Sequence, residues 1–282
     1  MGAMVKVVLA KNAGACYGVQ RALDLALEAS GNSDSVRTLG PLIHNPGVVR
    51  DLESRGVRVA NDLDEAAGST VIIRSHGVTP DVYEDIKQRG LEYVDATCPH
   101  VARAQKAAAQ LALDGCRVIV VGEAGHPEVE GLRAYARREG LKVDVVSSPE
   151  DVPEDLRAPI GVVVQTTQRR ENLDAVVAAI KEQGIEPVVK NTICSATRLR
   201  QDAAAELAGT VDAMVVIGGR NSSNTTRLAE ICMATCPRTH HIESVEEIDA
   251  GWFDGCSVVG VTAGASTPEN QIESVVNYLQ EL

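Results

Sequence analysis

The sequence predicts an α/β fold made of three pseudo-symmetric αβ lobes, each with a mostly parallel sheet. Two observations predict it. Short apolar runs that end in glycine or small polar residues alternate with helical patterns, which is typical of parallel sheets. The whole arrangement then recurs three times along the 282 residues. We therefore expect one lobe at 1–98, a second at 99–194 and a third at 195–282.

The first repeated element is an apolar run that ends at a glycine and is followed, four positions after that glycine, by a polar residue. It occurs at 38–44, 120–126 and 216–222. A helical pattern comes next, as at 48–52 and 129–132. This order indicates a strand, a glycine turn and the start of a helix.

The second repeated element is an apolar run that ends in polar or small residues. It occurs at 71–77, 162–167 and 258–266. Each run leads into a helical pattern, over 82–86, 173–180 and 272–279. Because parallel sheets present their ligand sites at the carboxyl ends of strands, we expect both sets of loops to face a central cavity.

Three of the seven cysteines hold one position in this repeat. Cys16, Cys98 and Cys194 each precede by 24 residues the glycine that ends the first repeated run, and the other four cysteines do not. Each of the three also precedes a helical pattern, over 19–27, 101–111 and 199–207. A thiol at a helix N-terminus meets the positive end of the helix dipole, which favours the thiolate that binds metals.

The spacing of these cysteines indicates an iron–sulfur cluster. They lie 82 and 96 residues apart, whereas zinc sites use closely spaced pairs. One cysteine from each lobe could hold three corners of one [4Fe–4S] cluster. Clusters that only transfer electrons normally have four cysteine ligands. With three, one iron stays open to bind a substrate as a Lewis acid.

Hydrogen-bonding side chains occupy the repeated loops around this expected cluster. They are His44, His76, His126, Thr166, Thr167, Ser222, Ser223, Asn224 and Ser266. Such groups at strand ends and helix starts suit an anion, although Lys and Arg are nearly absent there, Arg74 and Arg220 excepted. Glu128, two residues after His126, is the carboxylate placed to move protons.

Composition limits the partners. The net charge of −12 argues against nucleic acid and anionic membranes, since both need a basic face. No apolar run reaches the roughly 18 residues that span a bilayer, and no signal peptide is apparent. The odd number of cysteines fits a reduced, cytoplasmic protein. We expect a monomer.

The motifs together resemble the LytB/IspH family of 4-hydroxy-3-methylbut-2-enyl diphosphate reductases, of the non-mevalonate isoprenoid pathway. The matching segments are collinear and span most of the chain. They are CYGV at 16–19, GPLIHN at 40–45, SHG at 75–77, DATCP at 95–99, GHPEV at 125–129, QTT at 165–167, NTIC at 191–194, NSSNT at 221–225 and TAGAS at 262–266.

This resemblance implies an activity. A hydroxyl would be removed reductively from 4-hydroxy-3-methylbut-2-enyl diphosphate to give isopentenyl and dimethylallyl diphosphate. The hydroxyl would bind the open iron near Thr166, and Glu128 would feed protons toward it. Electrons would come from an external donor of the flavodoxin or ferredoxin type.

The resemblance also implies a set of ligands for the substrate diphosphate. They are His44, His76, His126, Ser222, Ser223, Asn224 and Ser266.

Plainer interpretations stay open for several of these residues. Any single cysteine is most simply a buried structural thiol, which is what we expect for Cys116, Cys232, Cys236 and Cys256. Glu128 could merely charge a helix N-terminus, and Ser222 and Asn224 could be helix caps. A non-enzymatic iron–sulfur carrier or redox sensor, or a metal-free α/β module that binds a diphosphate, are the alternative functions.

Overall fold

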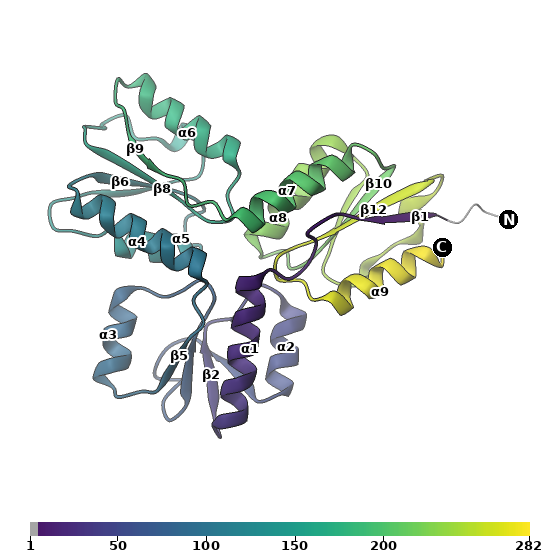
Figure 1. The fold of residues 1–282 in the computed structure, drawn as a ribbon, viewed down its shortest axis with the longest axis horizontal. Coiled ribbons are helices and arrows are strands. Elements are labelled where there is room, and N and C mark those ends of the chain that lie inside the picture. The colour runs from purple at the N-terminus through teal and green to yellow at the C-terminus, as the bar shows by residue number, and fades with distance from the viewer. Residues whose placement is uncertain (1–4) are drawn as a thin grey trace. The chain divides into compact units, whose positions relative to one another are not determined.

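The computed structural model describes residues 5–282. Within them the chain forms three four-stranded sheets whose strand pairs are all parallel (Figure 1). The α/β class and the three parallel sheets that the sequence predicted are thereby confirmed. Within the described residues, no helix is both long enough and apolar enough to cross a membrane.

The first sheet along the chain contains, in spatial order, β3 (Val57–Ala60), β2 (Val36–Leu39), β4 (Thr70–Ile73) and β5 (Tyr93–Asp95). The helices of this part of the chain are α1 (Tyr17–Asn32), α2 (Pro46–Ser54) and α3 (Pro80–Gln88).

The second sheet contains β7 (Val143–Val146), β6 (Arg117–Val121), β8 (Ile160–Val164) and β9 (Val188–Lys190). Its helices are α4 (Pro99–Leu113), α5 (Pro127–Tyr135) and α6 (Arg170–Glu182), and one 3₁₀ turn covers Pro149–Asp151.

The third sheet contains β11 (Thr239–Ile242), β10 (Ala213–Ile217), β12 (Val258–Ala263) and β1 (Lys6–Leu9). Its helices are α7 (Ser195–Ala208), α8 (Ser223–Thr235) and α9 (Glu269–Gln280), with 3₁₀ turns at Val245–Glu247 and Ala250–Phe253.

All three sheets therefore share one strand order. Counted along the chain from each repeated cysteine, the first strand (β2, β6 or β10) lies in the sheet between the second and the third strands. The fourth strand forms the edge, and in the third sheet this place is taken by β1 from the N-terminus, which pairs with β12. The expected first lobe at 1–98 is wrong in this respect, because residues 6–9 complete the third sheet, and residues 1–4 lie outside the described part.

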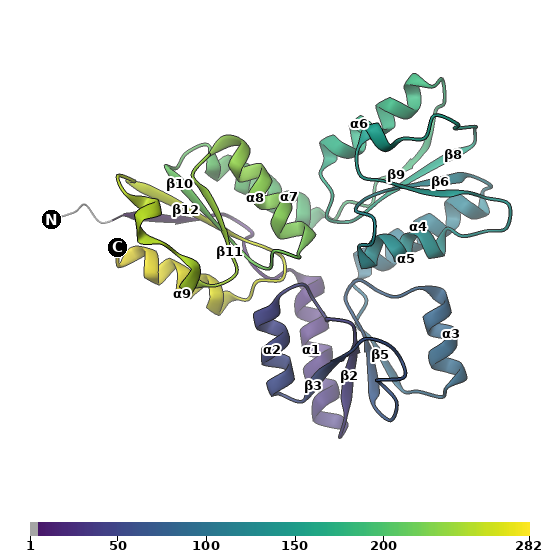
Figure 2. The ribbon, with the colours of Figure 1, turned by 180° about the vertical axis from the view of Figure 1, so that it is seen from behind.

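The sheets are buried on both faces, which explains their continuous apolar strands. In β6, Val118 and Val120 pack in the core under α4 and α5, whereas Ile119 and Val121 pack in the core under α6 (Figure 2). This alternation follows from the two-residue period of a strand.

The third sheet repeats this design, with α7 and α8 on one face and α9 on the other (Figure 1). Side chains of Ala, Val, Ile and Leu supply most of these cores, as expected from an aromatic content of 2%.

The described chain divides into two compact units. One comprises residues up to 20, 43–51 and 195–282, and holds the third sheet. The other comprises 21–42 and 52–194, and holds the first and second sheets. Each unit carries its own share of the predicted site residues.

Candidate functional site

The three repeated cysteines each stand at the start of a helix, as predicted. α1, α4 and α7 begin at the residue after Cys16, Cys98 and Cys194 respectively. These three cysteines are partly exposed, whereas the other four are buried. Burial raises the pKa of the Cys232 thiol to about 12 and also raises those of Cys116 and Cys256. The protein therefore buries four thiols and leaves the other three partly exposed at helix N-termini.

The same backbone hydrogen bond fixes each repeated cysteine. The backbone N–H of the cysteine donates to a carbonyl in the loop after the adjacent strand of the sheet, which is β12, β4 or β8. The acceptor is the second residue of that loop in each case. The pairs are Cys16 to Ala265 at 3.1 Å, Cys98 to Ser75 at 2.9 Å and Cys194 to Thr166 at 3.0 Å. The second repeated loop therefore sets the position of the cysteine backbone in every case.

The repeated glycines are equivalent as well. Each ends a strand and donates its N–H to the last carbonyl of the next strand in the sheet. The pairs are Gly40 to Ala60 at 2.7 Å, Gly122 to Val146 at 2.9 Å and Gly218 to Ile242 at 2.9 Å. The threefold register read from the sequence is thus a threefold register of backbone hydrogen bonds.

The helix that follows each glycine is capped by a polar side chain. His126 Nδ1 accepts the N–H of Glu128 at 3.1 Å and caps α5, and Ser222 Oγ accepts the N–H of Thr225 at 3.4 Å and caps α8. In α2 the corresponding bond, at 3.2 Å, runs to Asn45 Oδ1 from the Val48 N–H. His44 was expected to match His126 and Ser222, but the residue that caps α2 is the next one, Asn45. The turn between Gly40 and α2 is one residue longer than the equivalent turns before α5 and α8.

In the unit with the third sheet, His44 and Ser266 lie in contact. Ser266 Oγ donates to the His44 carbonyl at 3.2 Å, and Asn45 Nδ2 donates to the Ser266 carbonyl at 2.9 Å. A Cβ on Gly219 would lie only 2.6 Å from the His44 carbonyl oxygen. Only glycine there allows the loop before α8 to approach His44 so closely.

The first turn of α8 is buried and polar. Ser222, Ser223 and Asn224 are all more than nine-tenths buried. Asn224 is 4% exposed, and neither Nδ2 nor Oδ1 of its amide forms a hydrogen bond to any described residue. Because an unsatisfied buried amide is costly, this side chain is suited to a polar ligand at the helix N-terminus.

In the other unit, Glu128 and Thr166 form a closed pair. The Thr166 N–H donates to Glu128 Oε1 at 2.6 Å, and Thr166 Oγ1 donates to Oε2 at 2.8 Å. Glu128 is 1% exposed, and burial raises the pKa of its carboxyl to about 7 despite these two hydrogen bonds. A carboxyl with that pKa both holds and releases a proton near neutral pH.

His126 lies beside His76, with ring centroids 5.5 Å apart in an edge-to-face arrangement. Burial, and next the nearby charge of Arg74, lower the pKa of His126 to about 4. The imidazole is therefore neutral at pH 7. Since its Nδ1 accepts a hydrogen bond, the proton is on Nε2.

The two loop arginines noted in the sequence differ. Arg220 pairs with Glu243 and Glu247 on an exposed surface. The side chain of Arg74 lies against Gly40, and its Nε is buried without a hydrogen bond to a described residue. Burial lowers the pKa of Arg74. Only Arg74 therefore adds its charge to a predicted site residue, His126.

Sequence reasoning placed Asn45 and Gln165 in the matching motifs but gave neither a role in shaping these loops. Asn45 caps α2 and binds the loop of Ser266, and the Asn45-Pro46 step is itself a helix-start signal. Gln165 is fully buried, accepts the N–H of Glu123 at 3.0 Å and donates to Thr167 Oγ1 at 3.0 Å. Thr167 was predicted to face the site, but no pattern in the sequence marked Gln165 as its partner.

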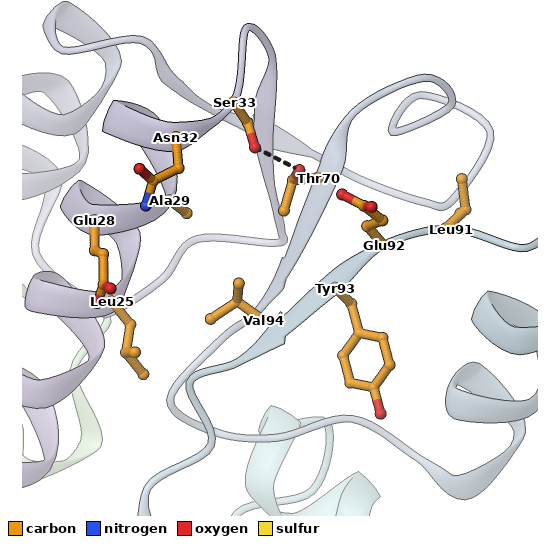
Figure 3. A pocket seen from close by; sticks show the side chains of 10 residues that line it. All are labelled: Leu25, Glu28, Ala29, Asn32, Ser33, Thr70, Leu91, Glu92, Tyr93 and Val94. Carbon is orange, nitrogen blue, oxygen red and sulfur yellow. Dashed lines mark hydrogen bonds between the residues drawn. The ribbon is translucent and has the colours of Figure 1, made fainter.

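A separate hollow of about 700 Å³ lies in the first sheet's part of the chain (Figure 3). It lies beside the amino end of β4, where Ser33 Oγ and Thr70 Oγ1 hydrogen bond at 2.9 Å, and is flanked by Glu28 and Glu92. The predicted site loops follow the opposite, carboxyl ends of the strands, and the hollow contains no cysteine or histidine. It is therefore distinct from the predicted site.

The chain is similar to known proteins over nearly its whole length. A family model described as LytB protein matches residues 7–280. The 4-hydroxy-3-methylbut-2-enyl diphosphate reductase of Pelobacter propionicus is 51% identical over 279 residues, covering 99% of each chain.

Two solved structures are also similar. One is of (E)-4-hydroxy-3-methyl-but-2-enyl diphosphate reductase, described as the terminal enzyme of the non-mevalonate pathway. It is 45% identical, with a TM-score of 0.72, and the match covers 99% of this chain and 100% of the other. The second, the E-1-hydroxy-2-methyl-but-2-enyl-4-diphosphate reductase from Plasmodium falciparum, is 26% identical with a TM-score of 0.89, over 97% and 87% of the two chains.

Proposed function

The chain belongs to the LytB protein family, and on that premise we propose that it is a 4-hydroxy-3-methylbut-2-enyl diphosphate reductase. The reaction consumes the hydroxylated diphosphate, two electrons and two protons. It releases water and gives isopentenyl or dimethylallyl diphosphate.

The observation that carries the proposal is the contrast among the cysteines. Cys16, Cys98 and Cys194 share one sequence register, one backbone hydrogen bond and one place before a helix, and they alone are partly exposed. Core packing requires none of these shared features. A common ligand that needs three thiolates accounts for all of them.

These residues suit a [4Fe–4S] cluster. Thiolates are the ligands such clusters take, and a helix N-terminus favours the thiolate form. When bound through three cysteines, the cluster would supply electrons and one iron open to a hydroxyl oxygen. The protein's own side chains would then bind the diphosphate and deliver protons.

The diphosphate would be bound by neutral donors. The first turn of α8 offers the N–H groups of a helix start, together with the hydroxyls of Ser222 and Ser223 and the unpartnered amide of Asn224. His44 and Ser266 lie in contact within the same unit. We propose His76 and His126 as further imidazole N–H donors to the diphosphate. Neutral donors of this kind bind an anion without needing surface lysines.

Glu128 and Thr166 would deliver the protons. In the ionised state Thr166 Oγ1 donates to Glu128 Oε2. When Glu128 is protonated, its O–H can donate to Thr166 Oγ1, which frees the threonine hydroxyl proton for the departing substrate oxygen. That oxygen leaves as water, so Glu128 acts as a general acid through Thr166.

We further propose that electrons arrive from an external donor of the flavodoxin or ferredoxin type, and that the enzyme is a cytoplasmic monomer. The net charge of −12 argues against nucleic acid and anionic membranes as partners.

Anaerobic purification tests the proposal directly. We expect a brown protein with four irons and four sulfides per chain that oxidises reduced methyl viologen only when the hydroxylated diphosphate is present. Cys98→Ser should lose iron and turnover, whereas Cys116→Ser, at a buried thiol outside the register, should keep both. A colourless, iron-free protein that binds the diphosphate would support the metal-free module. A brown protein without turnover would support an electron carrier or sensor.

A further inference from the structure

Arg200 is a buried cation that binds the chain leading to Cys16. It lies in α7, is 3% exposed, and its Nη2 donates to the Gly14 carbonyl at 2.7 Å. Its Nη1 donates to the Ala196 carbonyl at 3.1 Å, one turn earlier in the same helix. One guanidinium thus joins the residue two before Cys16 to the helix that starts after Cys194.

The chain at Gly14 is held on its other side as well. The Gly14 N–H donates to the Ala263 carbonyl at 3.3 Å, and its φ of +92° lies in the left-handed region. A Cβ there would lie 2.8 Å from Ile272 Cδ1. The backbone before Cys16 is therefore fixed between β12 and Arg200, with no room for a side chain.

Arg21 makes the corresponding contact in the other unit. It lies in α1, five residues after Cys16. Its Nη1 donates to the Thr97 carbonyl at 3.2 Å and its Nη2 to the Asp95 carbonyl at 3.3 Å. Thr97 immediately precedes Cys98, and so Arg21 binds the chain that leads into this second cysteine.

The two contacts follow one rule. Each arginine lies in a helix that starts after one repeated cysteine. Arg200 binds one carbonyl just before Cys16, and Arg21 binds two just before Cys98. The chain before Cys194 is held differently, because Thr192 Oγ1 hydrogen bonds with both the N–H and the carbonyl of Val164. A positively charged arginine thus binds the backbone just before two of the three repeated cysteines.

We propose that Arg200 and Arg21 are positioning residues that fix Cys16 and Cys98 and make the bound cluster easier to reduce. This inference rests on the proposed function. Three thiolates and a cluster carry negative charge, which increases when an electron is added. A guanidinium bound to the backbone before a ligand therefore stabilises the reduced form and raises the reduction potential. The burial of Arg200 limits screening of its charge by salt, whereas Arg21 is half-buried and its charge is screened more.

Lysine separates the two roles of Arg200. Its single ammonium keeps the charge but lacks the planar fork that reaches two carbonyls. Glutamine removes the charge. Arg198 is the matched control, since it is exposed in the same helix and pairs with Asp202, at 3.8 Å.

The test compares reconstituted wild type, Arg200→Gln, Arg200→Lys and Arg198→Gln by redox titration and by iron loss to a chelator. Arg200→Gln should weaken the reduced form about tenfold, a downward shift of about 59 mV for one electron, and lose iron several-fold faster. Arg200→Lys should keep its potential but lose iron faster, and Arg198→Gln should match wild type. An unchanged potential and iron half-life in Arg200→Gln would overturn the proposal.

Amide hydrogen exchange in the full-length apo-protein tests positioning without the cluster. Arg200→Gln should speed exchange of the Cys16 N–H, and Arg21→Gln that of the Cys98 N–H, each leaving the other cysteine unchanged. Equal exchange in all variants refutes the positioning role. If the wild type takes up no cluster, the proposed function fails, while the exchange result still decides the positioning role.

Discussion

The N-termini of α5 and α8 are built from the same elements and carry different chemistry. Both follow a strand that ends at a repeated glycine, and both are capped by a side chain, His126 in one and Ser222 in the other. In α5 the second helical residue is Glu128, closed against Thr166. In α8 it is Asn224, whose amide has no partner among the described residues.

This difference shows how a repeated scaffold is specialised. A carboxyl whose pKa is raised to about 7 can deliver a proton, whereas an unpartnered neutral amide can only donate or accept a hydrogen bond. The same helix position would therefore serve proton transfer in one lobe and ligand binding in another. Exchanging or removing either group tests that division.

The largest effect is expected for Glu128→Gln. Glutamine keeps the size and one hydrogen bond with Thr166 but cannot release a proton. We expect kcat to fall by about 10²–10⁴-fold, the usual contribution of a positioned general acid, with little change in substrate affinity. Steady-state kinetics and isothermal calorimetry measure the two. Glu130→Gln, at a partly exposed residue of the same helix, is the control and should leave kcat unaltered. Near-normal turnover in Glu128→Gln would remove this residue from the mechanism.

Asn224→Ala should act on binding instead. A hydrogen bond to a charged group contributes about 1.5–3 kcal/mol, so we expect KM to rise by about 10–100-fold while kcat changes little. Asn221→Ala, at an exposed residue of the same loop, is the control. If kcat falls as far as KM rises, then α8 takes part in the chemical step and the contrast with α5 is weaker than we infer.

The pH dependence of turnover and of stability should follow the ionisation of the Glu128 carboxyl in α5. Glu128 is an acid only while protonated, so kcat/KM should decline above pH 7 by about tenfold per unit. Because its folded pKa is raised from 4.5 to about 7, the associated stability is present at low pH and is lost as pH rises from 4.5 through 7. In chemical denaturation, the free energy of unfolding of Glu128→Gln should fall less than that of the wild type between pH 4.5 and 7. If the free energy of unfolding of both proteins depended on pH in the same way, the raised pKa would not belong to Glu128.

The smallest effect is expected for the caps. Ser222→Ala removes the side-chain bond to the Thr225 N–H and should lower the free energy of unfolding by about 1 kcal/mol. His126→Asn retains a capping oxygen and should leave stability closer to wild type while it weakens substrate binding. Thermal denaturation together with KM separates the two functions, and a large stability loss in both variants would mean that capping is their main role.

Much of the fold followed from local patterns. The helices expected after Cys16, Cys98 and Cys194, and those over 82–86, 173–180 and 272–279, are all present. So are the central strands, because strands buried on both faces consist mainly of apolar residues. The outer strands were less visible, since short edge strands such as β9, with all three residues exposed, lack that pattern.

The sequence by itself determined the α/β class, the threefold register and the three cysteines chosen from seven, since periodicity and spacing are local properties that a repeat preserves. Only the tertiary structure decided that β1 completes the third sheet, that Asn45 rather than His44 caps α2, and that Glu128 is buried against Thr166. These depend on contacts between residues far apart in the chain, and so do the bonds from Arg21 and Arg200, where charge and burial arise together only after folding.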